Sequence, residues 1–289
     1  MDILKKLFSP VAATMDYIQN HFKALLFLLL LIVLFYPTQK EHLEPNNLQS
    51  VELVGPIFDT TATVKALDKA RENDGIKGVL LVIDSPGGAV APSLEVAYAL
   101  KRLEREKPVV VYARGLLASG GYYAAIWADK IVANPGALVG SIGVIMEGVD
   151  LHGLMTKIGI RTQVAKAGKY KQVGTPDRAW TPDEKAEIDK VIHGTYEMFV
   201  HDVADARHLD MNRSRDFADA HIFTAAQAKA VGLVDEIGVE YDAKRTLEKL
   251  AKVEKPVWNE KSGFDRFVEK LTSKAIATVN TYFPAVTLK

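Results

Sequence analysis

The stretch Leu80-Leu-Val-Ile-Asp84-Ser-Pro-Gly-Gly88-Ala-Val joins a strand, a turn and a helix within a few residues. Its first residues are continuously apolar and rich in β-formers, as in a strand that is buried on both faces of a sheet. Pro-Gly-Gly then predicts a tight turn, which we interpret as structural, with Asp84 and Ser85 as turn and capping residues. The alternative for the two glycines is a backbone that points N–H groups into a cleft.

Apolar, β-rich runs alternate with helical patterns on both sides of this stretch. This alternation predicts an α/β fold with a mainly parallel sheet, whose functional loops lie at the carboxyl ends of the strands. The expected strands are Val51–Val54, 78–83, 109–112, 131–133, 141–145 and 161–164, and the expected helices are 62–71, 94–103, 122–128 and the stretch around Leu154.

The composition is that of a packed globular protein. The chain has 289 residues, of which 48% are hydrophobic and 25% charged, and its formal net charge is zero. A neutral chain has no global field that favours nucleic acid, so we expect no nucleic-acid partner. The chain contains no cysteine, which excludes disulfides and thiolate metal sites but does not decide the cellular compartment.

The N-terminal region contains one long apolar run. Residues 24–36 are uncharged and would form a helix of about 20 Å, which we interpret as an uncleaved membrane anchor because no signal-peptidase pattern follows. Lys5, Lys6 and Lys23 precede the run, whereas only Lys40 follows it closely. The positive-inside rule therefore predicts a single-pass protein with a cytoplasmic N-terminus and an extracytoplasmic main domain.

These patterns divide the chain into five parts. We expect a cytoplasmic segment at 1–23, a transmembrane anchor at 24–36, a polar linker at 37–47, a folded domain at 48–259 and a C-terminal amphipathic helix at 260–289. Within the folded domain, Thr181-Pro-Asp-Glu184 has the pattern of a capping box with proline at the first helical position. It predicts the start of a long amphipathic helix.

One serine stands in a setting suited to nucleophilic attack. The expected strand 109–112 exits through Arg114-Gly115, and Ser119-Gly-Gly then begins a helix. Ser119 could simply cap that helix. The two glycines also leave the hydroxyl uncrowded and place the Gly120 N–H beside it as an oxyanion donor, which would make Ser119 a nucleophile.

A lysine-rich stretch lies about fifty residues downstream. Lys166-Ala-Gly-Lys-Tyr-Lys171 is either a solvated charge run or the source of a neutral amine that takes the proton of a serine hydroxyl. In an extended segment Lys169 and Lys171 share a side and Lys166 points the other way. The pattern alone does not choose the base.

Six motifs in order resemble one family. They are Asp84-Ser-Pro-Gly-Gly, Ala118-Ser-Gly-Gly-Tyr-Tyr, Asp129-Lys-Ile-Val-Ala-Asn-Pro, Gly140-Ser-Ile-Gly-Val, Gly168-Lys-Tyr-Lys and Gly232-Leu-Val-Asp-Glu-Ile-Gly. Together they resemble the signal peptide peptidase A family, also called protease IV, from about Val51 to Gly238. The single copy of the domain behind one anchor is similar to the short bacterial form of that family.

This resemblance implies a fold, a site and a location. The implied fold is of the Clp-protease/crotonase type, built from repeated β-β-α units, and residues 48–259 become a serine–lysine peptidase domain in a bacterial inner membrane protein. Ser119 matches the family's nucleophile and Lys171 its general base, while Gly88 and Gly120 match the oxyanion donors. The implied activity is cleavage of residual signal peptides and other peptides by a homo-oligomer whose sites are shared between subunits, with no cofactor.

Other readings of the sequence remain open. A Ser-His-Asp site lacks a histidine at the spacing used by the Clp peptidase, and His152, His193, His201, His208 and His221 are interpreted as surface or core residues. No metal-ligand spacing occurs either. The rival functions are a crotonase-like acyl-CoA hydratase or isomerase, which would use carboxylates, and a non-catalytic membrane scaffold.

Overall fold

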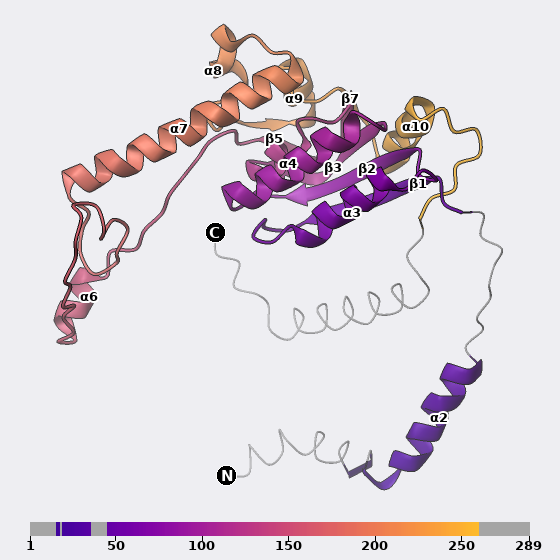
Figure 1. Ribbon diagram of the computed structural model, residues 1–289, viewed down its shortest axis with the longest axis horizontal. Helices are drawn as coiled ribbons and strands as arrows, with labels where there is room; N and C mark the ends of the chain where they lie inside the picture. Colours follow the sequence, from indigo (N-terminus) through magenta and orange to yellow (C-terminus); the bar gives the residue numbers. More distant parts are fainter. Residues whose placement is uncertain (1–15, 18, 36–44, 260–289) are drawn as a thin grey trace. The chain divides into compact units, whose positions relative to one another are not determined.

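The computed structural model describes residues 16–17, 19–35 and 45–259, which belong to two compact units (Figure 1). The first unit contains helix α2 (Phe22–Phe35), which covers most of the expected anchor. In the part of the chain that the structure describes, no helix combines the length and the apolar character needed to cross a bilayer. The expected C-terminal helix at 260–289 and most of the linker at 37–47 lie outside the described residues.

The second unit is built on a sheet whose main path is parallel. Its strand order is β1 (Leu48–Val54), β2 (Gly78–Ser85), β3 (Val109–Ala118), β4 (Lys130–Ala133) and β7 (Glu236–Ile237). Every pair along this path is parallel. The α/β class and the mainly parallel sheet are therefore confirmed, and the first four expected strands occur within these bounds.

A short branch extends the sheet beside the end of β3. Strand β5 (Leu138–Gly140) pairs in parallel with the last residues of β3, and β6 (Ile222–Thr224) pairs antiparallel with β5, so the sheet is mixed. The strand expected at 141–145 is wrong, because the strand found here, β5, ends at Gly140. Gly140 and Ser141 have φ of 112° and 51°, which lie outside the extended range, so the strand does not continue. The expected strand at 161–164 is also wrong, since this segment forms no strand.

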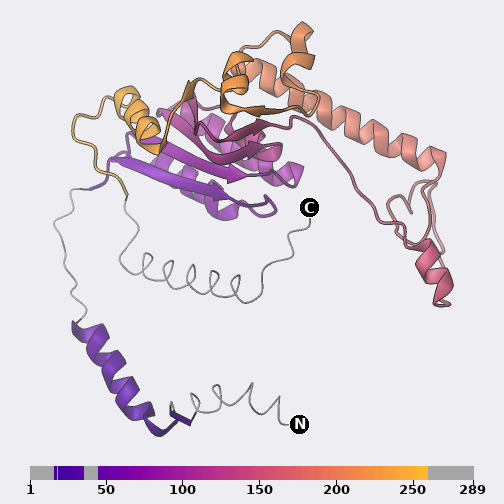
Figure 2. The same ribbon diagram turned by 180° about the vertical axis from the view of Figure 1, so that it is seen from behind.

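Helices cover both faces of the main sheet (Figure 2). Helices α3 (Thr61–Glu72), α4 (Val90–Glu104) and α5 (Gly120–Ala125) contribute buried side chains to one core, and α10 (Glu240–Leu250) contributes to the other. Strand β2 supplies both cores, because its side chains alternate between the faces. Val79, Leu81 and Ile83 enter the first core, and Leu80 and Val82 enter the second.

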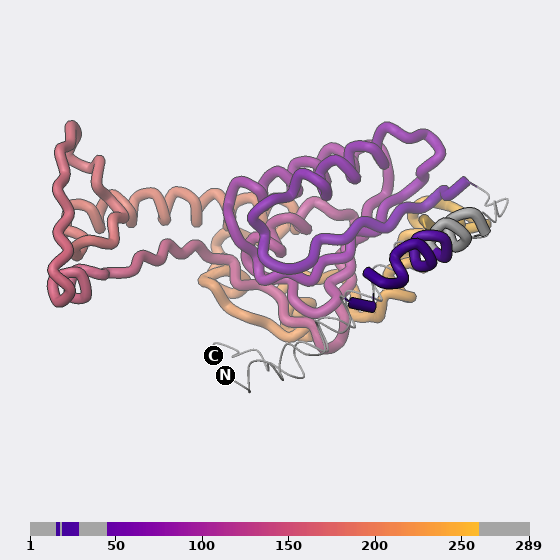
Figure 3. The backbone as a smooth tube through the Cα atoms, turned by 90° about the horizontal axis from the view of Figure 1, so that it is seen from below, coloured from indigo at the N-terminus to yellow at the C-terminus, as the bar shows by residue number. Residues whose placement is uncertain are grey.

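One long helix leaves the core and carries a separate segment at its far end. Helix α7 (Pro182–Arg207) begins at the predicted capping box, which is confirmed because Thr181 and Glu184 each bond the other's backbone N–H. Its carboxyl half packs into the first core. Residues 144–181, here called the arm, run from the core to the amino end of α7 and include α6 (His152–Lys157) (Figure 3). The remaining helices are η1 (Met211–Arg213), α8 (Ser214–Phe217) and α9 (Ala225–Ala230).

Candidate active site

A bulge in β3 sets the position of Ser119. The register between β2 and β3 shifts between Ile83 and Ser85, so β3 carries additional residues before it pairs again at Leu117. The Asp84 carboxylate holds this bulge by accepting a hydrogen bond of 2.9 Å from the Leu116 N–H. Asp84 therefore supports the backbone of the neighbouring strand, rather than only its own turn, and β3 runs on to end next to Ser119.

Ser119 itself has an unusual backbone conformation. Its φ is 52° and its ψ is −125°, a region that residues other than glycine avoid at a cost of order 1–3 kcal/mol. The Ser119 N–H donates to the Gly140 carbonyl at 2.8 Å, which ties the turn to β5. The side chain makes no capping hydrogen bond to α5. The capping interpretation of Ser119 is therefore wrong, and its half-buried hydroxyl faces a pocket.

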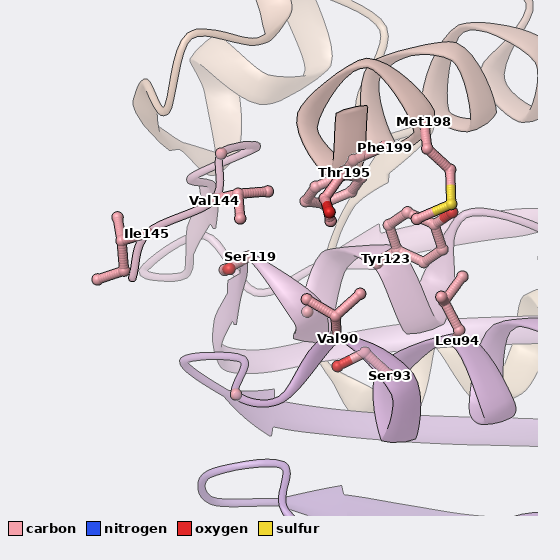
Figure 4. A pocket seen from close by; sticks show the side chains of 13 residues that line it. Val90, Ser93, Leu94, Ser119, Tyr123, Val144, Ile145, Thr195, Met198 and Phe199 are labelled. Carbon is pink, nitrogen blue, oxygen red and sulfur yellow. The ribbon is translucent and has the colours of Figure 1, made fainter. Parts of the chain in front are cut away.

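This pocket has a volume of about 100 Å³ and joins Ser119 to Gly88 and Gly120 (Figure 4). The Ser93 hydroxyl donates to the Ala89 carbonyl in the preceding turn of α4, and that of Thr195 donates likewise within α7. Both hydroxyls are thereby engaged within their own helices. Its other lining residues are Val90, Leu94, Tyr123, Gly143, Val144, Ile145, Met198 and Phe199.

Two backbone N–H groups lie beside Ser119. The turn that carries Gly88 is pinned to Ile57, which donates its N–H to the Gly87 carbonyl at 2.9 Å and accepts from the Ala89 N–H at 2.8 Å. Among the described residues, none accepts a hydrogen bond from the Gly88 or Gly120 N–H. A Cβ on Gly88 would collide with the Ile57 carbonyl, which explains the glycine. Ile57 was not identified from the sequence, because it lies in a connection with no chemical motif.

Tyr123 forms part of the pocket wall. Its hydroxyl donates to the Asp202 carboxylate, and its ring packs against Phe199 with centroids 4.5 Å apart. Burial, together with this hydrogen bond, raises the pKa of Tyr123, so the phenol stays protonated at neutral pH. Tyr123 is therefore a fixed wall rather than a base. No sequence motif indicates Asp202 as the partner, because it lies far from Tyr123 along the chain.

Lys171 lies on the arm and not in the Ser119 pocket. It borders an open hollow with Lys166, Thr175 and Asp177. Neighbouring Lys169 forms an ion pair of 2.7 Å with Asp183, and this hydrogen bond raises the pKa of Lys169. A lysine held in that way keeps its proton and is a poor base. Of the described carboxylates, none lies within ion-pair distance of Lys171.

The length of α7 separates the two groups within one chain. The pair of Lys169 with Asp183 holds the lysine-bearing loop at the first turn of α7, whereas Thr195 borders the Ser119 pocket. At about 1.5 Å per residue, the helix between Asp183 and Thr195 spans ~18 Å, which exceeds the reach of a lysine side chain. The structure thus brings Ser119, Gly88 and Gly120 together and leaves Lys171 apart.

Histidine and carboxylate side chains are absent from the lining of the Ser119 pocket in the described chain. The groups that this pocket offers to a ligand are the half-buried hydroxyl of the strained Ser119 and the backbone N–H groups of Gly88 and Gly120. Such a set can hold an acyl group beside the hydroxyl and stabilise negative charge on its oxygen, provided that a base is supplied from elsewhere.

Sequence comparison gives this arrangement a family. Residues 101–254 match the family described as Peptidase family S49. The chain belongs to this family. The resemblance drawn from the six motifs is thereby confirmed, because relatives named as signal peptide peptidase SppA and protease 4 are among those found.

Three relatives, one from an archaeon and two from bacteria, show the extent of the similarity. A protein of Methanocaldococcus jannaschii named as a candidate protease is 47% identical over 198 residues, which cover 68% of this chain and 64% of the relative. A candidate protease of Synechocystis is 39% identical, covering 71% of this chain and 75% of the relative. A candidate signal peptide peptidase SppA of Enterococcus faecium is 36% identical, covering 65% and 55%. The chain therefore spans a little over half to three quarters of these relatives' lengths.

Solved structures resemble the chain more loosely. A ClpP1 variant from Listeria monocytogenes has a TM-score of 0.45 and 18% identity, covering 67% of this chain and 93% of that one. A membrane-bound stomatin-specific protease variant has a TM-score of 0.46 and 15% identity, covering 71% of this chain and 86% of the other.

Proposed function

We propose that this chain is a membrane-anchored serine endopeptidase that cleaves signal peptides and other peptides at the membrane. In this proposal Ser119 attacks the peptide carbonyl, neutral Lys171 takes the hydroxyl proton and returns it to the leaving amine, and the Gly88 and Gly120 N–H groups stabilise the oxyanion. The fold would be of the Clp-protease/crotonase type. No cofactor takes part in the reaction.

The conformation of Ser119 is the observation that carries this proposal. A strained serine persists only where the surrounding structure imposes the conformation, and such residues concentrate at active sites. Here the strain keeps the hydroxyl out of the helix cap and turns it towards a pocket that has two N–H groups without an acceptor among the described residues. Membership of a peptidase family supports the assignment of those groups to peptide cleavage.

Separation of Lys171 from Ser119 leads us to propose a homo-oligomer in which each site takes its lysine from a neighbouring subunit. The arm and the first half of α7 also expose large apolar side chains. Exposed apolar patches of this kind are typical of protein–protein interfaces. A neighbouring copy that received the arm would cover them. These exposed residues are Ile145, Val149, Leu154, Ile158, Ile160, Val164 and Val191.

The membrane part of the proposal rests on the N-terminal run and its lysines. The apolar run at 24–36 would act as a single-pass anchor in a bacterial inner membrane, with the N-terminus in the cytoplasm and the peptidase domain at 48–259 outside. The acyl-CoA hydratase alternative is disfavoured, because the lining of the Ser119 pocket includes no carboxylate from the described residues.

Labelling with a fluorophosphonate tests the proposed nucleophile directly. The full chain should react covalently at Ser119, and Ser119→Ala should abolish the reaction. Ser214→Ala serves as the matched control, because Ser214 begins α8 and does not line the pocket. Labelling that persists in Ser119→Ala at another serine would refute Ser119 as the nucleophile, whereas a folded oligomer that is never labelled would refute a serine peptidase and favour the scaffold.

A further inference from the structure

Ser85 is a buried hydroxyl behind the proposed active site. It is the last residue of β2, its side chain has no exposed surface, and it does not line the Ser119 pocket. The sequence presents it as a turn residue. A buried hydroxyl needs hydrogen-bond partners, and the identity of those partners shows what the residue holds in place.

The hydroxyl of Ser85 connects two segments. It donates to the Gly55 carbonyl at 2.7 Å and accepts from the Gly87 N–H at 3.1 Å. Gly55 leads out of β1 towards Ile57, which in turn bonds the backbone on both sides of Gly88. One side chain therefore ties the glycine turn to the connection that supports the same turn from its other side.

The turn rests directly against the nucleophile. Gly87 has a φ of 92°, and a Cβ at this position would lie 2.6 Å from the Gly120 nitrogen and 2.8 Å from the Ser119 Cβ. Further along the start of α5, a Cβ on Gly121 would lie 2.9 Å from the Ser85 carbonyl oxygen. Ser85 and its turn are thus packed between β1 and the start of α5, with no room for the turn to shift without moving Ser119.

We propose that Ser85 is a positioning residue that fixes the distance and direction of the Gly88 N–H relative to the Gly120 N–H, so that both meet one oxyanion. The proposal rests on the function assigned above to Ser119. Ser85 does not touch substrate. It acts through two hydrogen bonds: its hydroxyl accepts one from the Gly87 N–H and donates one to the Gly55 carbonyl.

Loss of the Ser85 hydroxyl should change kcat, and not only the stability of the fold. Charge on the carbonyl oxygen develops in the transition state, so a displaced N–H weakens transition-state binding more than substrate binding. Removing one oxyanion donor costs about 10²–10³ in kcat. Ser85→Ala displaces a donor without deleting it, so we expect a fall in kcat of about 10–100-fold with KM nearly unchanged.

The experiment measures peptide cleavage and the affinity of a peptide aldehyde with the same sequence. The aldehyde adds to the Ser119 oxygen and places an oxyanion in the same site, so its affinity should fall with kcat/KM. Thr60→Val is the matched control, because the Thr60 hydroxyl is buried and donates to the Pro92 carbonyl at 3.1 Å, yet it does not line the pocket. It should lose stability without the fall in kcat. Ser85→Cys keeps the size of the side chain and weakens both hydrogen bonds, which gives a second variant if Ser85→Ala does not fold.

Two results would overturn the positioning role. One is a folded Ser85 variant with wild-type kcat and aldehyde affinity, and the other is a change confined to KM. Failure of the proposed function is separate, because it would show as a wild-type chain that neither cleaves peptides nor reacts with a fluorophosphonate at Ser119.

Discussion

Mixing two inactive variants tests whether the active site combines two subunits. Ser119→Ala chains retain Lys171, and Lys171→Ala chains retain Ser119, so neither assembles a complete site alone. In one chain, α7 holds the two residues apart by a helix segment of ~18 Å. If a neighbour supplies the lysine, co-assembly of the two variants must restore some sites.

The size of the recovery follows from random assembly. With equal amounts of the two chains, a site receives an intact serine with a chance of about one half and an intact lysine from its neighbour with the same chance. About one quarter of wild-type activity should therefore return. If both residues acted in one chain, every chain would carry one defect and no site would recover.

The assay is cleavage of a fluorogenic peptide after the variants are unfolded and refolded together. Native mass spectrometry of tagged chains must show that mixed oligomers form, and each variant refolded alone provides the background. A verified mixed oligomer without activity would refute the shared site and require the arm to fold back onto its own Ser119 pocket.

Three further predictions concern the base, the pocket and the topology. Lys171→Ala should be as inactive as a serine variant, whereas Lys169→Ala should retain most activity, because Lys169 is paired with Asp183. Because only a neutral amine accepts a proton, a lysine base predicts a rate that rises with pH, and a rate that falls steadily from about pH 6 to 9 in folded enzyme would exclude such a base. Leu94→Phe narrows a pocket of about 100 Å³. It should raise KM more for a peptide with a large side chain before the cleaved bond than for a peptide with alanine there, and kinetics measured in parallel on the two peptides would show this difference. Alkaline phosphatase fused after Lys289 should be active outside the cytoplasm, and a stable but inactive fusion would invert the topology.

The sequence predicted the elements that are decided by local pattern. The apolar run ending at Ile83 is a strand because its side chains enter two cores, and α7 begins directly after Thr181 because a capping box needs only neighbouring residues. Strand β3 continues far beyond the predicted Tyr112, since the Asp84 carboxylate holds its bulge. That contact joins two strands and leaves no local signal in the sequence.

The site was predictable only where its residues lie in local sequence motifs. Ser119 and the glycines lie in short motifs, and the structure brings them into one pocket. Ile57, Tyr123 and Asp202 were missed, because their roles depend on contacts between distant segments. The choice of Lys171 among three lysines came from the family resemblance and remains a prediction. Its separation from Ser119 is a property of the tertiary structure that spacing along the chain does not reveal.

Peptide cleavage by Ser119→Ala is the most direct measurement of the central claim. The variant removes only a half-buried hydroxyl that makes no cap bond, so it should fold and assemble as the wild type does. Loss of a covalent nucleophile typically lowers kcat by many orders of magnitude. The account predicts activity below about 1% of wild type under conditions where the two proteins have the same unfolding midpoint. Activity above that level from verified, protease-free Ser119→Ala would contradict it.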